Sequence, residues 1–103
     1  MIIFVAGSPW SLNILENLAD FGQCDIDKRA ILLRRDQSPE QMTATLIHEL
    51  IHAIWEIVDL DNFDPANLEE TVAHRLGEAF GSIFCDPRNA ATLATFGIQT
   101  VNR

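Results

Sequence analysis

The most informative part of this chain is SPEQMTATLIHELIHAIWEIV, residues 38–58. It begins with Ser38, whose hydroxyl can cap a helix, and continues with Pro39 at the first helical position. Gln41 stands three residues after the serine, as in a capping box. The apolar residues that follow recur with helical periodicity and fill most of the helical wheel. We therefore predict one long helix from Ser38 to about Val58, buried on most sides and carrying a single polar stripe.

The segments ahead of this helix read as strands. Residues 2–6 predict a strand, and Gly-Ser-Pro at 7–9 predicts the turn that ends it. Residues 10–18 fit either a helix or the second strand of a hairpin, and Gly22 ends that segment under both interpretations. Residues 30–35 are a short β-type run with one face expected to be buried. The pattern predicts a small sheet of about three strands, mainly antiparallel.

The segments after the long helix read as helices. Polar residues at 59–64 predict a loop, and a second helix starts at its end and reaches about Phe84. Residues 87–96 predict a short third helix that Gly97 terminates. Strands followed by helices indicate an α+β domain, and a chain of 103 residues is the length of one domain, residues 1–103.

Composition narrows the classes of protein that this chain can represent. An apolar fraction of 48% supports a buried core, but no apolar run approaches the roughly 20 residues of a membrane-spanning helix. Fifteen acidic residues against seven basic ones give a net charge of −8, which disfavours binding to nucleic acid. Cys24 and Cys85 form no metal-type or redox-type pair, so we expect two small buried thiols. The start of the chain lacks the features of a secretory signal, and we expect a cytoplasmic protein with no membrane partner.

The chemistry of the long helix is concentrated in the sequence HELIH. His48 and His52 are four residues apart, so they lie one turn apart on the same helix face and can both bind one Zn²⁺ at about 2.0–2.1 Å. Glu49 lies beside them, where a general base for a zinc-activated water is placed in zinc hydrolases. The plain alternative is that these residues form an ordinary solvated stripe. The predicted burial of the other faces favours the zinc site.

A catalytic zinc ion commonly has three protein ligands, so a third ligand is expected from the second helix. Three residues compete: Glu69, which shares the apolar face of that helix; Glu70, on its flank; and His74, one turn after Glu70. Acidic residues in a first turn also favour the helix dipole without any metal. Spacing alone leaves the choice open.

The order of strand, HELxH helix, acidic loop and glutamate-rich helix resembles the small zinc metallopeptidases of the ImmA/IrrE-like group, including compact phage and prophage forms. In that group the third ligand is a Glu within a pattern like E-x-x-A-N, which Glu70, Ala73 and His74 match except that His replaces Asn. The resemblance implies that Glu70 is the third metal ligand and that a repressor or other regulatory protein is the substrate. The chain contains no Tyr, so either the zinc ion alone or another side chain must stabilise the oxyanion, and among the side chains we favour His74 over Arg34, Arg35 and Arg75.

These observations predict a zinc-dependent metallopeptidase. His48, His52 and Glu70 would hold Zn²⁺, Glu49 would act as general base and His74 would be a second catalytic residue. A protein or peptide substrate would lie extended beside the strand at residues 30–35. The alternative is a metal-stabilised adaptor that has lost turnover, because the chain has no Tyr and is short. A nucleic-acid-associated protease of the SprT type fits less well, since no basic or zinc-ribbon region is present.

Overall fold

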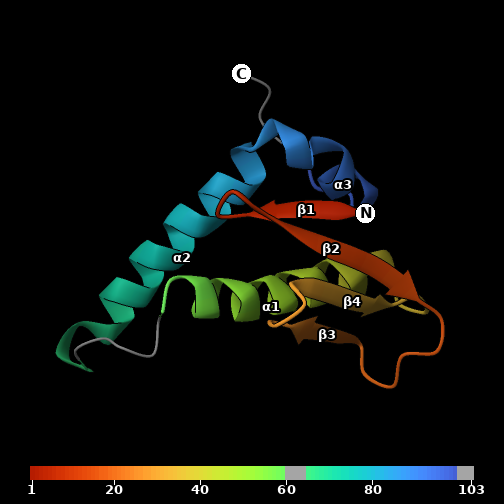
Figure 1. Cartoon of the computed structure of the whole chain (residues 1–103), viewed down its shortest axis with the longest axis horizontal. Helices are drawn as coiled ribbons and strands as arrows, with labels where there is room; N and C mark the ends of the chain where they lie inside the picture. The colour runs from red at the N-terminus through yellow and green to blue at the C-terminus, as the bar shows by residue number, and fades with distance from the viewer. Residues whose placement is uncertain (60–64, 100–103) are drawn as a thin grey trace.

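The computed structural model describes residues 1–59 and 65–99, which form a four-stranded mixed sheet and three α-helices (Figure 1). The strands are β1 (Ile2–Val5), β2 (Ser8–Leu15), β3 (Gly22–Asp25) and β4 (Ala30–Arg34). The helices are α1 (Pro39–Ile57), α2 (Leu68–Cys85) and α3 (Ala90–Thr95), with 3-10 turns at Pro65–Asn67 and Pro87–Asn89. The predicted α+β class is confirmed.

The sheet has the strand order β1-β2-β4-β3. Strands β1 and β2 are antiparallel, as are β3 and β4, while β2 and β4 run parallel. The prediction of about three strands is therefore wrong by one strand, β3. Its four residues, Gly-Gln-Cys-Asp, are not rich in the β-branched and aromatic residues that mark strands, so the segment carries no strand signal of its own. Pairing with β4 holds it in the sheet.

The hairpin of β1 and β2 settles the ambiguous segment at residues 10–18. Ala6 and Gly7 have φ of 50° and 80°, and positive φ at both central residues is typical of the two-residue turn whose twist matches that of paired strands. The strand interpretation of this segment is confirmed as far as Leu15. Ser8 and Pro9, predicted in the turn, belong instead to β2.

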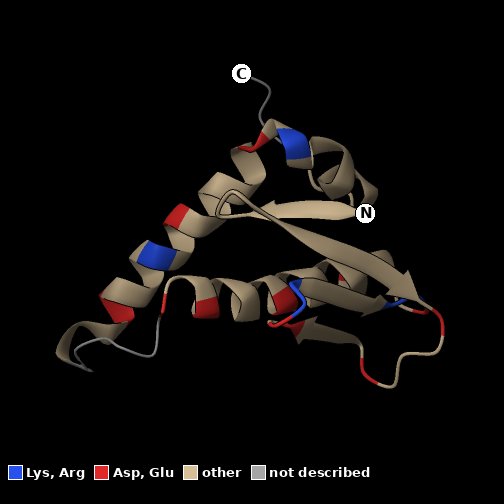
Figure 2. Ribbon diagram, in the orientation of Figure 1, with Lys and Arg blue, Asp and Glu red and all other residues tan. Residues whose placement is uncertain are grey.

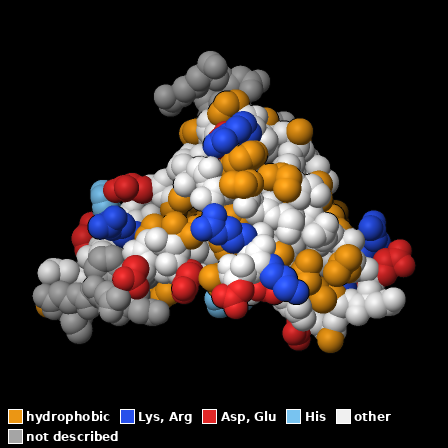
Figure 3. All heavy atoms as spheres, viewed as in Figure 1, with side chains coloured by type: hydrophobic (Ala, Val, Ile, Leu, Met, Phe, Trp, Pro, Cys, Tyr) orange, Lys and Arg blue, Asp and Glu red, His pale blue; other side chains and the backbone are white. Residues whose placement is uncertain are grey.

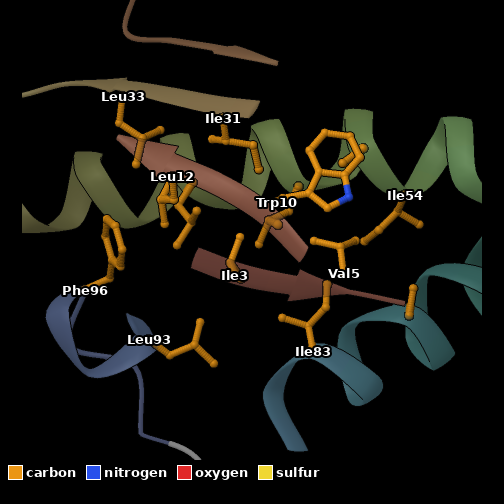
Figure 4. Close-up of a cluster of buried hydrophobic side chains, with 14 residues drawn as sticks. Ile3, Val5, Trp10, Leu12, Ile31, Leu33, Ile54, Ile83, Leu93 and Phe96 are labelled. Atoms are coloured by element: carbon orange, nitrogen blue, oxygen red, sulfur yellow. The ribbon is translucent and has the colours of Figure 1, made fainter. Parts of the chain in front are cut away.

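Helix α1 packs on one face of the sheet, and its contacts are with β1, β3 and β4. The buried core lies between these layers, with Trp10 as its largest side chain (Figure 4). The prediction that α1 is buried on most sides is wrong, because Ile47 and Ile51 are only half-buried and Ile57 is exposed. The described part of the chain covers one side of this helix. The fully buried core side chains are Ile3, Val5, Leu12, Ile31, Leu33, Leu46, Leu50, Ala53, Ile83 and Leu93.

The C-terminal segment covers one edge of the sheet. Asn89 is fully buried; its side chain accepts a hydrogen bond from the Phe4 N–H at 2.7 Å and donates to the Phe4 carbonyl at 2.8 Å. The Thr92 hydroxyl donates to the Ile2 carbonyl at 2.9 Å. These contacts satisfy polar groups on the outer side of β1. Within the described residues, the other edge strand, β3, has β4 as its single strand neighbour.

The helices after α1 begin and end close to the predicted positions. Helix α2 ends at Cys85, and the predicted third helix is the 3-10 turn followed by α3, ended by Gly97 with φ of 73°. Cys85 is exposed, so its predicted burial is wrong, while Cys24 is half-buried. Most of the predicted loop, residues 60–64, lies outside the described residues. No helix in the described ranges is both long enough and apolar enough to cross a membrane.

Candidate metal centre

The helix that carries the candidate site starts where the sequence predicts. The Ser38 Oγ accepts a hydrogen bond from the Gln41 N–H at 3.1 Å, which confirms the predicted N-cap. The Gln41 side chain does not complete a capping box; its amide donates to the Thr45 Oγ1 at 3.3 Å. Thr45 in turn donates to the Gln37 Oε1 at 2.7 Å. The first turns of α1 are thereby fixed to the segment that leads out of the sheet.

The two motif histidines converge on one point. The Nε2 atoms of His48 and His52 are 3.3 Å apart, and the ring centroids are 5.0 Å apart with the ring planes at 67°. Two nitrogens bound to one tetrahedral Zn²⁺ at 2.0–2.1 Å are about 3.3–3.4 Å apart. The same distance suits a hydrogen bond between one protonated and one unprotonated ring nitrogen. Both side chains are exposed, so a metal ion held between them would be open to a substrate.

Glu49 lies beside the histidines but is buried. Its side chain is 6% exposed, and one carboxylate oxygen lies within 4.8 Å of the ligand nitrogens of both His48 and His52. None of the described residues donates a hydrogen bond to this carboxylate. Its oxygens open onto two neighbouring cavities, where a metal ion or a ligand can reach them. The donor set of two imidazoles and a carboxylate therefore fits a metal ion of the zinc type.

Strand β3 covers Glu49. A Cβ atom placed on Gly22 would lie 2.7 Å from the Thr45 Cγ2 and 2.9 Å from the Glu49 Oε2, distances that a real side chain does not tolerate. The lack of a side chain at this position is what lets the strand approach α1 so closely. Gly22 and β3 are the parts of the site that sequence reasoning missed. A glycine inside a short segment is the available signal, and alone it is weak.

Two cavities flank Glu49 in the cleft between β3 and α1. The first has a volume of about 330 Å³ and the second about 380 Å³, and Glu49 lines both. The first cavity is also lined by Cys24, Ile26, His52, Trp55 and Glu56. The second is also lined by Asp20, Phe21, Gly22, Gln41, Ala44, Thr45 and His48. The candidate metal group therefore sits in the middle of a groove that extends in both directions along the helix.

The half-buried Cys24 thiol faces the first cavity. Burial, with smaller contributions from the nearby carboxylates of Glu49 and Asp25, raises its pKa from 9.0 to about 11. The neutral thiol form therefore persists to high pH in the metal-free protein. A thiol of this kind is a weak nucleophile at neutral pH, because the thiolate is the reactive species.

The structure does not bring the predicted residues of α2 to this group. The metal-binding group found among the described residues consists of His48, Glu49 and His52, without Glu69, Glu70 or His74. Glu69, Glu70 and His74 are exposed, and His74 forms an ion pair with Glu78. The N-terminal end of α2 lies beyond the C-terminal end of α1 (Figure 1). The assignment of Glu70 as third ligand and of His74 as a catalytic group stays a prediction.

The strand expected to receive a substrate is also different. Strand β4 contains the predicted residues 30–34, but it lies between β2 and β3 and has no free edge. The edge next to the metal group belongs to β3. The Arg34 N–H donates to the Phe21 carbonyl at 2.8 Å, so by the alternation of antiparallel pairs the peptide groups of Gly22 and Cys24 point away from β4. These groups are oriented to pair with an added strand.

Comparison of the chain with protein-family models, with curated proteins and with solved structures finds no match. What the site can do therefore rests on its donor atoms and its surroundings. Two imidazoles and a carboxylate can hold a metal ion, and the metal group opens onto a groove with a free strand edge.

Proposed function

We propose that this protein is a zinc-dependent peptidase that hydrolyses a bond within an extended protein segment. The observation that carries the proposal is the 3.3 Å separation of the His48 and His52 Nε2 atoms beside the buried carboxylate of Glu49. The resemblance of the sequence to ImmA/IrrE-like metallopeptidases, described above, points to the same chemistry. A regulatory protein remains the expected class of substrate.

His48 and His52 would hold the zinc ion, with Glu70 as the third ligand implied by the resemblance. Bound zinc would supply Lewis acidity, which polarises a peptide carbonyl and makes water acidic enough to ionise near neutral pH. For Glu70 to join the histidines, the first turns of α2 must move toward α1. Those turns have few buried side chains to hold them, since Leu68 is 43% exposed and Glu69, Glu70 and Ala73 are exposed.

Glu49 would act as the general base. Its carboxylate lines both cavities, so a water molecule and a peptide bond in the groove are both within its reach. It would take a proton from water as the new C–O bond forms, and it would then deliver that proton to the departing amine as the C–N bond breaks. Strand β3 covers one side of this carboxylate, and the two cavities leave its other sides accessible to water and to a peptide.

The substrate would lie along β3. This strand has one strand neighbour, and the peptide groups of Gly22 and Cys24 face the open side. A peptide that adds to this edge forms backbone hydrogen bonds whatever its side chains, which places a peptide bond opposite the Glu49 carboxylate. The other edge of the sheet is already satisfied by Asn89 and Thr92.

The test separates metal binding from hydrolysis. We expect Glu49→Gln to keep zinc while peptide cleavage falls by about 10²- to 10⁴-fold, because it removes the base and preserves the shape of the side chain. His48→Ala and His52→Ala should lose zinc, and Glu16→Gln, a change at an exposed residue after β2, should alter neither property. Zinc is measured by competition with a chromophoric chelator and cleavage by mass spectrometry of a peptide mixture. A Glu49→Gln variant that cleaves as fast as the parent would refute the mechanism.

A metal-binding adaptor without turnover is the second candidate. It is favoured by the position of His74, which pairs with Glu78 and lines neither cavity, so no oxyanion donor from α2 faces the groove. An adaptor would bind zinc through His48 and His52 and would bind its partner equally well with Glu49→Gln. Absence of cleavage by the zinc-loaded parent, with partner binding retained, would support this candidate.

A further inference from the structure

We propose that the groove selects a peptide carrying a Lys or Arg side chain on each side of the bond opposite Glu49. This inference rests on the proposed function, and it adds the class of substrate. It follows from the charges and the apolar surfaces of the two cavities.

The side chains that line the two cavities include Asp20, Glu49 and Glu56 but no Lys or Arg. Helix α1 as a whole contains Glu40, Glu49 and Glu56 but no Lys or Arg, whereas the turn after β3 carries Lys28 and Arg29 (Figure 2). Several acidic side chains lie along the lower edge of the molecule, with basic side chains near them (Figure 3). A low-dielectric groove lined by one sign of charge concentrates ligands of the opposite sign.

The first cavity combines an apolar wall with a carboxylate. Trp55 and Ile26 supply the apolar surface, and Glu56, one residue after the indole, supplies the charge. Lys and Arg place their aliphatic stems along apolar surface and keep the cationic head at a polar or charged group. A cation above an indole ring gains further electrostatic attraction. A purely apolar side chain in this cavity would leave the Glu56 carboxylate without a cationic partner.

The second cavity repeats this combination at the other end of the groove. Phe21 and Ala44 supply apolar surface, and Asp20 supplies the carboxylate. The Phe21 ring already receives a guanidinium, since the Arg34 Cζ lies 4.3 Å from its centroid. The charge of Arg34 is balanced by Asp36, whose Oδ1 is 2.7 Å from the Arg34 Nε. Asp20 therefore keeps its charge available to a cation that enters the cavity.

Glu49 makes the two cavities parts of one site. It is buried, receives no hydrogen bond from the described residues, and lines both cavities. A bond held at Glu49 consequently has one cavity on each side of it. One basic side chain before the bond and one after it would place a cation near Asp20 and another near Glu56.

The test uses three ten-residue peptides that differ only at the two central residues, which are Lys-Lys, Ala-Ala or Glu-Glu. Binding is measured by fluorescence anisotropy to zinc-loaded protein in the Glu49→Gln background. We expect the Lys-Lys peptide to bind about tenfold more tightly than the Ala-Ala peptide at low salt, with the difference shrinking at high salt. Adding Asp20→Asn or Glu56→Gln should each reduce this preference about three- to fivefold, while affinity for the Ala-Ala peptide is unchanged.

Glu16→Gln is the matched control, since it removes one exposed carboxylate after β2 that lies outside both cavities. Equal affinity for the Lys-Lys and Ala-Ala peptides would overturn the inference, as would an equal loss with Glu16→Gln. Cleavage by the parent separates this inference from the proposed function. Cleavage of all three peptides at one rate contradicts the basic preference alone, whereas tight Lys-Lys binding without any cleavage contradicts the peptidase alone.

Discussion

Replacing Gly22 by Ala tests whether the close approach of β3 positions the Glu49 carboxylate. The added Cβ would lie 2.7 Å from the Thr45 Cγ2, 2.9 Å from the Glu49 Oε2 and 3.0 Å from the Glu49 Cγ. Restoring 3.4 Å, the start of ordinary van der Waals contact, requires a shift of about 0.7 Å against the threonine methyl and about 0.5 Å against the carboxylate. Thr45 is 5% exposed and tied to Gln37 and Gln41, so it has little room to yield.

The expected cost has two parts. Overpacking of a buried position destabilises by about 1–3 kcal/mol, so the free energy of unfolding should fall by that amount. A misplacement of about 1 Å in a catalytic group can cost about 10²-fold in rate, so a shift of about half that size should reduce cleavage by about tenfold or more. Zinc affinity should change little, because His48 and His52 are exposed and do not face the added atom.

The assay compares Gly22→Ala with Gly81→Ala in urea unfolding, zinc competition and peptide cleavage. Gly81 lies within α2, and a Cβ there would meet nothing within 4 Å. The same substitution should therefore stabilise by about 0.4–1 kcal/mol, since it lowers the entropy of the unfolded chain and improves helix propensity. If Gly22→Ala unfolds at the parent urea concentration and cleaves at the parent rate, the packing of β3 against Glu49 does not position the base.

Three further predictions concern stability. Asn89→Ala should lower the free energy of unfolding by about 2–3 kcal/mol, because it leaves the Phe4 N–H and carbonyl on the β1 edge without hydrogen-bond partners. Asn13→Ala, at an exposed position, should change the free energy of unfolding by less than about 0.5 kcal/mol, and urea unfolding measures both variants. Ser38→Ala should cost about 1 kcal/mol by removing the cap of α1, and a thermal midpoint equal to that of the parent would contradict this role. The raised pKa of Cys24, about 11 against 9.0, means that the unfolded thiol loses its proton first as pH rises. Stability should therefore fall between about pH 9 and 11 in the metal-free protein, and Cys24→Ala should reduce that slope in urea titrations at stepped pH.

The parts of the molecule that sequence could predict are those set by local chemistry. The cap at Ser38 and the pairing of His48 with His52 depend on residues within one or two helical turns, so spacing predicts them directly. The turn at Gly7 and the end of α3 at Gly97 likewise follow from glycine at positive φ. Each of these features needs no knowledge of what packs against the segment.

The parts that sequence could not predict depend on contacts between distant segments. Strand β3 has no strand signal in its own residues and exists because β4 offers an edge. Helical periodicity predicts burial for the half-exposed side of α1, because the spacing of apolar residues does not show whether another element covers them. The open edge of the sheet could not be located either, because it depends on the parallel pairing of β2 with β4, which places β4 inside.

The position of the proposed third metal ligand, Glu70, also depends on contacts between distant segments. His48 and His52 are joined by one helical turn, so their nitrogens meet wherever α1 goes. Glu70 belongs to a different helix, α2, which packs on β1, on the 3-10 turn before α3 and on α1, so its position relative to the histidines depends on that packing. Few side chains in the first turns of α2 are buried, so moving those turns gives up little buried apolar surface. If Glu70 is the third ligand, as proposed, the metal ion would bind to His48 and His52 on α1 and draw the exposed first turns of α2 toward it, so metal binding and this movement would occur together.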